Sequence, residues 1–167
     1  TVVWIAVLCA QAFATAVITH NTVHVPMFES GRANRWMQVA ISLLYGNSVS
    51  VFVRGHNYSH HRYTQSPKDL MRTTKARFRW NLLNQLFFLA IVGPAIERGN
   101  HVFIRIERER ATRWYRQFSI ERWAVRIFTV LALLIDWRSA LLFVLIPRLF
   151  GIWAIAGINY AQHDGCD

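Results

Sequence analysis

Six of the seven histidines in this chain lie in three short groups, and each group adjoins an apolar stretch. The groups are His20-Asn21-Thr22-Val23-His24, His56-Asn57-Tyr58-Ser59-His60-His61 and Asn159-Tyr160-Ala161-Gln162-His163. Random placement would scatter the histidines, whereas a transition-metal site needs several imidazoles close together. The grouping therefore indicates a metal site, and the apolar neighbours indicate that this site belongs to a membrane-bound enzyme.

The spacing within the first two groups lets the imidazoles converge if each group is helical. Residues four apart lie on one helix face, about 5–6 Å from each other, so His20 and His24 can point at one centre. His56 and His60 repeat that spacing. His61 is rotated by about 100° from His60, so it can address a second centre while His60 addresses the first.

The third group again places two polar side chains, Asn159 and His163, four residues apart. None of the groups contains a cysteine, and imidazoles without thiolate favour iron, copper or zinc over a hard cation. Six imidazoles are too many for one tetrahedral zinc, so we expect two metal ions. His101 stands alone in a basic segment and is not expected to be a ligand.

Two roles are open for Asp69. Its carboxylate can accept a hydrogen bond from a ligand imidazole, which orients the ring and raises its basicity. Alternatively, Ser66-Pro67-Lys68-Asp69 has the residues of a helix start, with Ser as N-cap, Pro in the first turn and an acid at the third position.

The composition favours a membrane protein. The chain is 53% hydrophobic, yet it carries 19 Lys and Arg against 9 Asp and Glu. A nucleic-acid-binding protein would interleave basic residues with polar sequence, not with runs such as Leu131-Ala132-Leu133-Leu134-Ile135, so nucleic acid is not an expected partner. Cys9 and Cys166 are isolated, so no CxxC motif suggests zinc or redox chemistry.

Three apolar segments precede residue 100. Residues 1–19 carry no charge, and as a helix they would be roughly 28 Å long, enough to span a bilayer. A cleaved signal peptide is the alternative, but its basic start is missing. Residues 36–53 contain several amide and hydroxyl side chains, so we expect an interfacial or partly re-entrant segment. Residues 80–96 contain Gly93-Pro94, which ends or kinks a helix.

Residues 120–137 and 139–158 predict a helical hairpin that crosses the membrane twice and turns at Asp136-Trp137-Arg138. Groups that share a metal site must lie on one side of the bilayer. With only the hairpin crossing between them, residues 97–122, which hold seven Arg and four acids, lie on the metal side. The positive-inside rule makes that side cytoplasmic.

The HxxxH, HxxxHH and NYxxH elements, in this order and separated by apolar segments, resemble the membrane fatty-acid desaturase and hydroxylase superfamily. The resemblance covers nearly the whole chain. The second cluster with Ser66-Pro67-Lys68-Asp69, and the late Asn159 and His163, look most like the alkane-hydroxylase version, which usually has Glu before the second cluster. Gly55 holds that place here, so the bacterial fatty-acid desaturase-like proteins are the better match.

This resemblance implies an all-α integral membrane protein with two non-haem irons on its cytoplasmic side and O2 as co-substrate. The implied iron ligands are His20, His24, His56, His60, His61 and His163. Asn159 would lie next to the metal, either directly or with a water molecule between them. The implied reaction is hydrogen abstraction from a lipid or fatty-acyl chain, with desaturation as the first interpretation and hydroxylation as the alternative.

Electrons must come from another protein, because the chain has neither a dinucleotide-binding fingerprint nor a cysteine cluster for iron–sulfur. A ferredoxin, rubredoxin or cytochrome-type donor is implied. The arginine run in residues 105–116 is expected to contact anionic lipid headgroups, with an acidic electron donor as the alternative partner.

Members of the superfamily have a further HxxHH cluster after the late histidine, and residues 1–167 lack it. We therefore expect a single desaturase-like membrane domain, 1–167, that is a fragment of a longer protein.

Two other classes of membrane protein fit the sequence less well. A non-enzymatic membrane haem electron carrier would hold single histidines deep in separate helices, and a histidine-rich metal transporter would line its spans with acidic residues.

Overall fold

The computed structural model describes residues 1–165, apart from the side chains of residues 53–55 and 58, and this part of the chain is helical without a strand. The α-helices are α1 (Val2–Thr22), α2 (Gly31–Tyr45), α3 (Val49–Val53), α4 (His61–Tyr63), α5 (Asn81–Glu109), α6 (Arg113–Ala140) and α7 (Ile146–His163). The π-helical segments are η1 (Arg54–His60) and η3 (Leu141–Leu145), and η2 (Thr73–Lys75) is a 3-10 turn. The expected all-α fold is confirmed.

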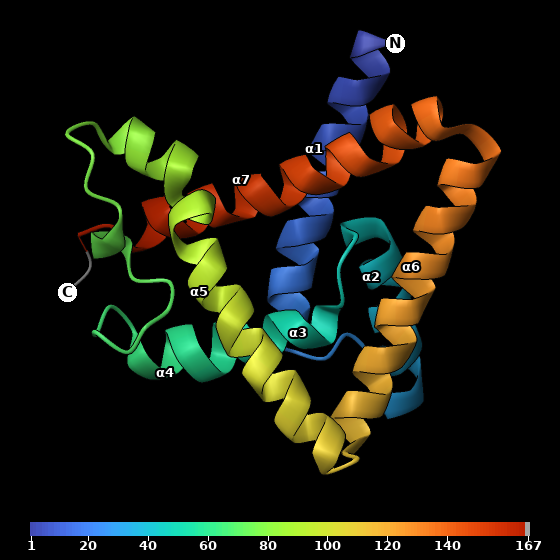
Figure 1. The fold of residues 1–167 in the computed structure, drawn as a ribbon, viewed down its shortest axis with the longest axis horizontal. Helices are drawn as coiled ribbons and strands as arrows, with labels where there is room; N and C mark the ends of the chain where they lie inside the picture. The colour runs from blue at the N-terminus through green and yellow to red at the C-terminus, as the bar shows by residue number, and fades with distance from the viewer. Residues whose placement is uncertain (166–167) are drawn as a thin grey trace.

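Helix α7 runs across α1 and also packs against α5 (Figure 1). Gly151 allows the close approach to α1, because a Cβ at this position would lie 2.8 Å from the carbonyl oxygen of Ala12. The contact with α5 buries Phe88, Val92 and Tyr160. Packing on two neighbours fixes the position of α7, whose last turn carries the late histidine.

The chain bends at Asp136, where the sequence indicated a hairpin turn. However, the helices before and after the bend do not pack along each other. Asp136 leaves the helical conformation, with φ −156° and ψ 100°. From this bend α6 packs on α2, whereas α7 packs on α1 and α5, so the arms diverge (Figure 1). Helix α6 therefore supports α2, whereas α7 supports α1 and α5.

Of the two outcomes expected at Gly93-Pro94, an end or a kink, the end does not occur, since α5 continues through Pro94. A proline removes one backbone donor and crowds the preceding turn. Burial of Phe88 and Val92 before the proline, and of Asn100 after it, supplies packing on both sides. Tertiary contacts outweigh the local cost of the proline here.

The polar side chains of residues 36–53 are satisfied inside the protein. Ser42, Ser48 and Ser50 are all buried. The Ser42 hydroxyl accepts a backbone N–H, and the other two hydroxyls donate to the carboxylate of Glu121 on α6. Because these groups have partners, the polar content of this segment is compatible with burial.

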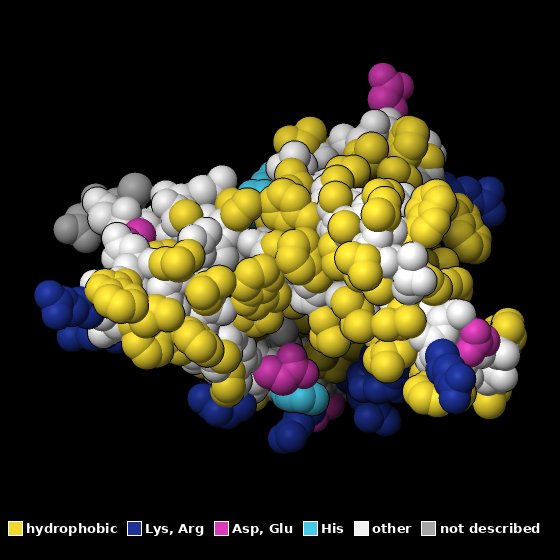
Figure 2. Space-filling model, turned by 90° about the horizontal axis from the view of Figure 1, so that it is seen from above, with side chains coloured by type: hydrophobic (Ala, Val, Ile, Leu, Met, Phe, Trp, Pro, Cys, Tyr) yellow, Lys and Arg dark blue, Asp and Glu magenta, His cyan; other side chains and the backbone are white. Residues whose placement is uncertain are grey.

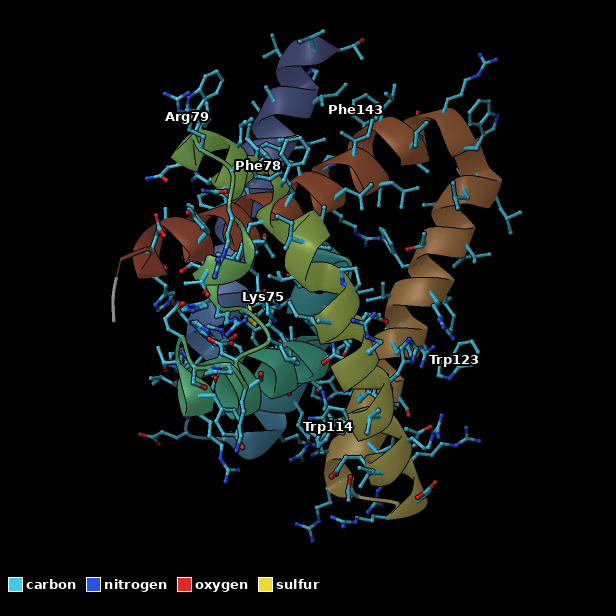
Figure 3. All side chains as sticks on the ribbon, turned by 60° about the vertical axis from the view of Figure 1, so that its left-hand side comes forward. Lys75, Phe78, Arg79, Trp114, Trp123 and Phe143 are labelled. Carbon is cyan, nitrogen blue, oxygen red and sulfur yellow. The ribbon has the colours of Figure 1, made fainter. Side chains whose placement is uncertain are left out.

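By length and composition, two helical stretches could cross a membrane, Val2–Thr22 and Arg113–His163. Helix α6 exposes many large apolar side chains, among them Ile120, Trp123, Ile127, Leu131, Leu134, Ile135 and Trp137. Figure 2 shows a face on which hydrophobic side chains gather while most Lys and Arg lie at its edges. Trp123 points away from the other helices (Figure 3).

Candidate metal centre

Four histidines from two segments of the chain converge beside the end of α1. Their ligand nitrogens all lie within 4.8 Å of one another, and the four residues are His20, His24, His56 and His61. The Nε2 atom of His56 lies 3.2 Å from Nε2 of His24 and 2.9 Å from Nε2 of His61. We call these four residues the four-histidine group.

The spacing of these nitrogens suits a single metal ion. Histidine nitrogens bind zinc or a similar ion at about 2.0–2.1 Å, which places tetrahedral ligands about 3.3 Å apart. The two measured Nε2 separations, 2.9 and 3.2 Å, are close to that spacing. In softness, the nitrogen of a neutral imidazole lies between a carboxylate oxygen and a thiolate sulfur. Such ligands suit iron, copper and zinc.

The pairing of His56 with His61 differs from the sequence prediction, which paired His56 with His60. The reason is the π-helical turn η1, Arg54–His60. A π-helix closes hydrogen bonds over five residues, so side chains five apart come together where an α-helix would separate them. Such a turn has no clear sequence signature, and spacing based on an α-helix therefore missed this pair.

His60 and His163 form a second pair next to the four-histidine group. Their ring centroids are 4.5 Å apart. His60 is fully buried, and its Nε2 has no hydrogen-bond partner among the described residues. The buried Nδ2 of Asn159, on the same helix as His163, likewise lacks one. A buried polar nitrogen without a partner is costly; a metal ion would satisfy the His60 lone pair, and a water bound to that ion could accept from the Asn159 amide.

Asp69 holds His60 from the other side. Its Oδ2 lies 2.8 Å from Nδ1 of His60, and both side chains are fully buried. The backbone N–H of Gln65 also donates to Oδ2, and that of Met71 donates to Oδ1. Burial acts to raise the pKa of Asp69, but the His60 hydrogen bond and these backbone donors outweigh it and lower the pKa.

The alternative role for Asp69, as part of a helix start, is wrong. Residues 66–68 form a bend and a turn, and no helix follows them until η2. The carboxylate instead closes the loop onto His60. This arrangement leaves Nδ1 of His60 as the donor and Nε2 as the free lone pair, the tautomer that a metal ligand requires.

Asp69→Asn should weaken metal binding at the His60 and His163 pair by about 10–100-fold, the usual effect of losing a carboxylate behind a ligand imidazole. An amide has one acceptor oxygen, whereas both oxygens of Asp69 accept hydrogen bonds. Competition with a chelator would measure this affinity. Lys68→Gln, an exposed neighbour, is the control, and equal affinities in the two variants would contradict the role given to Asp69.

His101 lies apart from both groups. It pairs with Glu97 at 3.2 Å, one turn earlier on α5, and its side chain is 68% exposed. The structure therefore brings six of the seven histidines together and leaves this one on the surface, as the spacing predicted.

The surroundings favour the neutral form of the imidazoles in the four-histidine group. Burial first, and the surrounding imidazoles second, lower the pKa of His56 to about 2. The same causes lower the pKa of His61. A neutral imidazole is the form that binds a metal ion, so these ligands need not lose a proton at physiological pH.

The family model for fatty acid desaturases matches residues 1–167. The chain belongs to the fatty acid desaturase family. No curated protein and no solved structure matches it. Members of the desaturase family are membrane-associated oxidoreductases that act on fatty acyl chains and are known to use iron.

In this desaturase-family protein, a cavity of about 350 Å³ opens beside the four-histidine group. His20 and His56 form part of its wall. Most of the remaining wall is apolar and includes Val17, Phe52, Leu89, Ile152, Ile155 and Ile158. Its size lies in the range of small-ligand sites. Sequence analysis missed this cavity, because its lining comes from several helices and follows no motif.

Proposed function

We propose that this desaturase-family protein is an integral membrane di-iron oxygenase that desaturates lipid acyl chains with O2 as co-substrate. The observation that carries the proposal is the pair of adjoining histidine clusters, one of which contributes His20 and His56 to the wall of a mostly apolar cavity. Removal of hydrogen from an unactivated C–H bond needs a strong oxidant close to an aliphatic chain and away from water. The imidazoles would hold the metal that supplies the oxidant, and the mostly apolar cavity beside them would hold the aliphatic chain.

The four-histidine group would hold one iron. His60 and His163 would hold the other, with Asn159 beside it through a water. When bound, the irons would supply the O2-dependent oxidising chemistry. The protein would orient the ligands, since Asp69 holds the His60 ring at 2.8 Å and the buried π-helical turn fixes His56.

The apolar cavity would hold the acyl chain against the wall formed by His20 and His56. Aliphatic side chains make up most of the remaining wall and would favour an apolar chain over water. The carbon that reacts would therefore be selected by the depth to which the chain enters.

Electrons would come from an external ferredoxin, rubredoxin or cytochrome-type donor. The last turns of α5 and the connection to α6 are rich in exposed arginine, including Arg105, Arg108 and Arg110. A basic surface attracts an acidic redox partner and raises its association rate. This surface lies at the end of the fold where α5 and α6 meet (Figure 1).

The proposed membrane topology places the α5–α6 turn on the cytoplasmic side with the histidines and the Asp136 bend on the opposite side. Single cysteines at Arg110 and Ser139, both exposed, should then label from opposite faces of sealed vesicles. Cys9 and Cys166 would be replaced in the background. Labelling of both sites from one face would rule out a crossing by α6.

The proposed function is tested with the full chain reconstituted with iron, a reduced electron donor and a saturated acyl lipid. We expect O2-dependent formation of a carbon–carbon double bond, identified by mass spectrometry. A hydroxylated product would establish the hydroxylase alternative. A Soret absorption band in the purified protein would instead indicate a haem electron carrier, although the two adjoining clusters of described histidines suit non-haem metal better.

A further inference from the structure

One buried hydroxyl group in the wall of the apolar cavity has no partner within the described protein. Tyr45, the last residue of α2, lines this cavity and is 6% exposed. No described residue forms a hydrogen bond with its hydroxyl. A buried tyrosine normally finds a partner for its O–H, because a hydroxyl taken out of water without one is costly.

Tyr160 shows the usual arrangement. Tyr45 and Tyr160 are the two tyrosines that are buried among the described residues. The Tyr160 hydroxyl donates to the carboxylate of Asp164 and accepts from the amide of Asn84. Tyr45 has neither kind of partner, so its hydroxyl is left for a molecule that enters the cavity.

Ring contacts place Tyr45 close to the four-histidine group. Its ring centroid lies 6.2 Å from that of Phe52, and the two rings meet edge to face. The Phe52 centroid in turn lies 5.3 Å from the centroid of His56 and 6.2 Å from that of His20. A chain held against His20 and His56 would therefore pass close to Tyr45.

The surroundings of the Tyr45 hydroxyl suit an uncharged group. Burial raises the pKa of the Tyr45 phenol, so the hydroxyl keeps its proton. The described wall of the cavity contains no Lys or Arg, and its one carboxylate is that of Glu97. An anion beside Tyr45 would have no cation to offset its loss of water, whereas one donor can satisfy a carbonyl or hydroxyl oxygen.

We propose that the Tyr45 hydroxyl donates a hydrogen bond to an uncharged oxygen, a carbonyl or a hydroxyl, that the substrate carries along its chain. This inference rests on the proposed function and narrows its substrate class to chains with an oxygen at a set distance from the reacting carbon. The hydrogen bond would set the depth to which the chain enters, since the aliphatic wall alone lets it slide. Phenylalanine would suit a plain chain better, because it has the same ring and no hydroxyl to desolvate.

The test uses hexadecane and a series of hexadecanones in which the carbonyl stands at successive carbons of the same chain. Binding to the full chain is measured by equilibrium dialysis in a neutral detergent without an electron donor, so no turnover occurs. Alkane and ketone partition differently into detergent, so each probe is compared between the unchanged protein and Tyr45→Phe. We expect this variant to weaken the binding of one hexadecanone, or of two neighbouring isomers, by about tenfold. Binding of hexadecane and of the remaining isomers should not weaken.

Infrared spectroscopy tests the same contact directly. The isotope-labelled carbonyl of the responsive hexadecanone should stretch at a lower frequency in the unchanged protein than in Tyr45→Phe, because a hydrogen bond weakens the C=O bond. A merely structural role of the hydroxyl would not move this band. Tyr115→Phe, which removes a half-buried hydroxyl outside the cavity wall, is the matched control and should resemble the unchanged protein in both measurements.

Three results would overturn the inference. The first is an equal effect of Tyr45→Phe on hexadecane and on every hexadecanone, which is expected if the hydroxyl holds only a water molecule. The second is a carbonyl band that does not move. The third is a clear loss of thermal stability in Tyr45→Phe, since that would show that the hydroxyl has a partner within the protein.

These outcomes are separable from the proposed function. Binding that is indifferent to the Tyr45 hydroxyl, with double-bond formation intact, would refute the Tyr45 contact alone. Tyr45-dependent binding of a hexadecanone without O2-dependent product would refute the desaturase proposal and leave the contact.

Discussion

Replacing His61 by alanine should remove one of two bound irons from the protein. His61 contributes an Nε2 that lies 2.9 Å from Nε2 of His56 in the four-histidine group, and alanine has no lone pair to replace it. The side chain is exposed, so the substitution should change the free energy of unfolding by less than about 0.5 kcal/mol. Loss of metal would then reflect loss of a ligand and not loss of the fold.

His101→Ala is the control for this experiment, because it also removes an exposed imidazole from a helical segment. Iron per chain, measured by mass spectrometry of purified protein, should be unchanged in this variant. Membrane insertion would be compared for both. The ligand assignment fails if His61→Ala keeps both irons, or if His101→Ala loses one while inserting normally.

Much of the site could be predicted because its ligands lie in short local motifs. Imidazole spacing singled out His20, His24, His56, His61 and His60, and the structure brings all of them together in two adjoining clusters. The spacing also separated His101 from them. Local patterns of this kind survive folding, since they depend on one or two helical turns.

The division of the histidines between two clusters could not be predicted. It depends on the π-helical geometry of η1, which pairs His56 with His61, and on the loop that brings Asp69 to His60. Neither the π-helical turn nor this short loop follows a recognisable sequence pattern. The sequence also left open whether α5 ends or kinks at Gly93-Pro94, and packing on both sides of the proline accompanies a helix that continues.

The fold contains a second buried acid whose role no motif indicated. Glu121 on α6 is fully buried. Its Oε2 accepts the Ser48 hydroxyl at 2.6 Å and the Ser50 N–H at 2.9 Å, and its Oε1 accepts the Ser50 hydroxyl at 2.8 Å. These donors lie at the start of α3, which continues without a gap into η1 and α4. Glu121 thus ties α6 to the segment that carries His56 and His61.

Glu121→Ala should lower protein stability by roughly 3 kcal/mol or more, because several buried donors would lose their acceptor at once. It should also weaken metal binding by the four-histidine group, since the start of its supporting helix would no longer be held. Glu121→Gln keeps the shape and one acceptor oxygen, and we expect an intermediate loss. Thermal unfolding in detergent and chelator competition below the unfolding temperature would measure the two effects separately.

Glu109→Ala removes an exposed carboxylate near the end of α5 and should change stability by less than about 0.5 kcal/mol. If Glu121→Ala unfolds at the same temperature as this control, the buried carboxylate does not stabilise the fold. If it unfolds earlier but binds metal normally while folded, Glu121 stabilises the α3–α6 contact without positioning the histidines. Joint loss of stability and affinity, with partial recovery in Glu121→Gln, is the result expected when one hydrogen-bonded contact supports both.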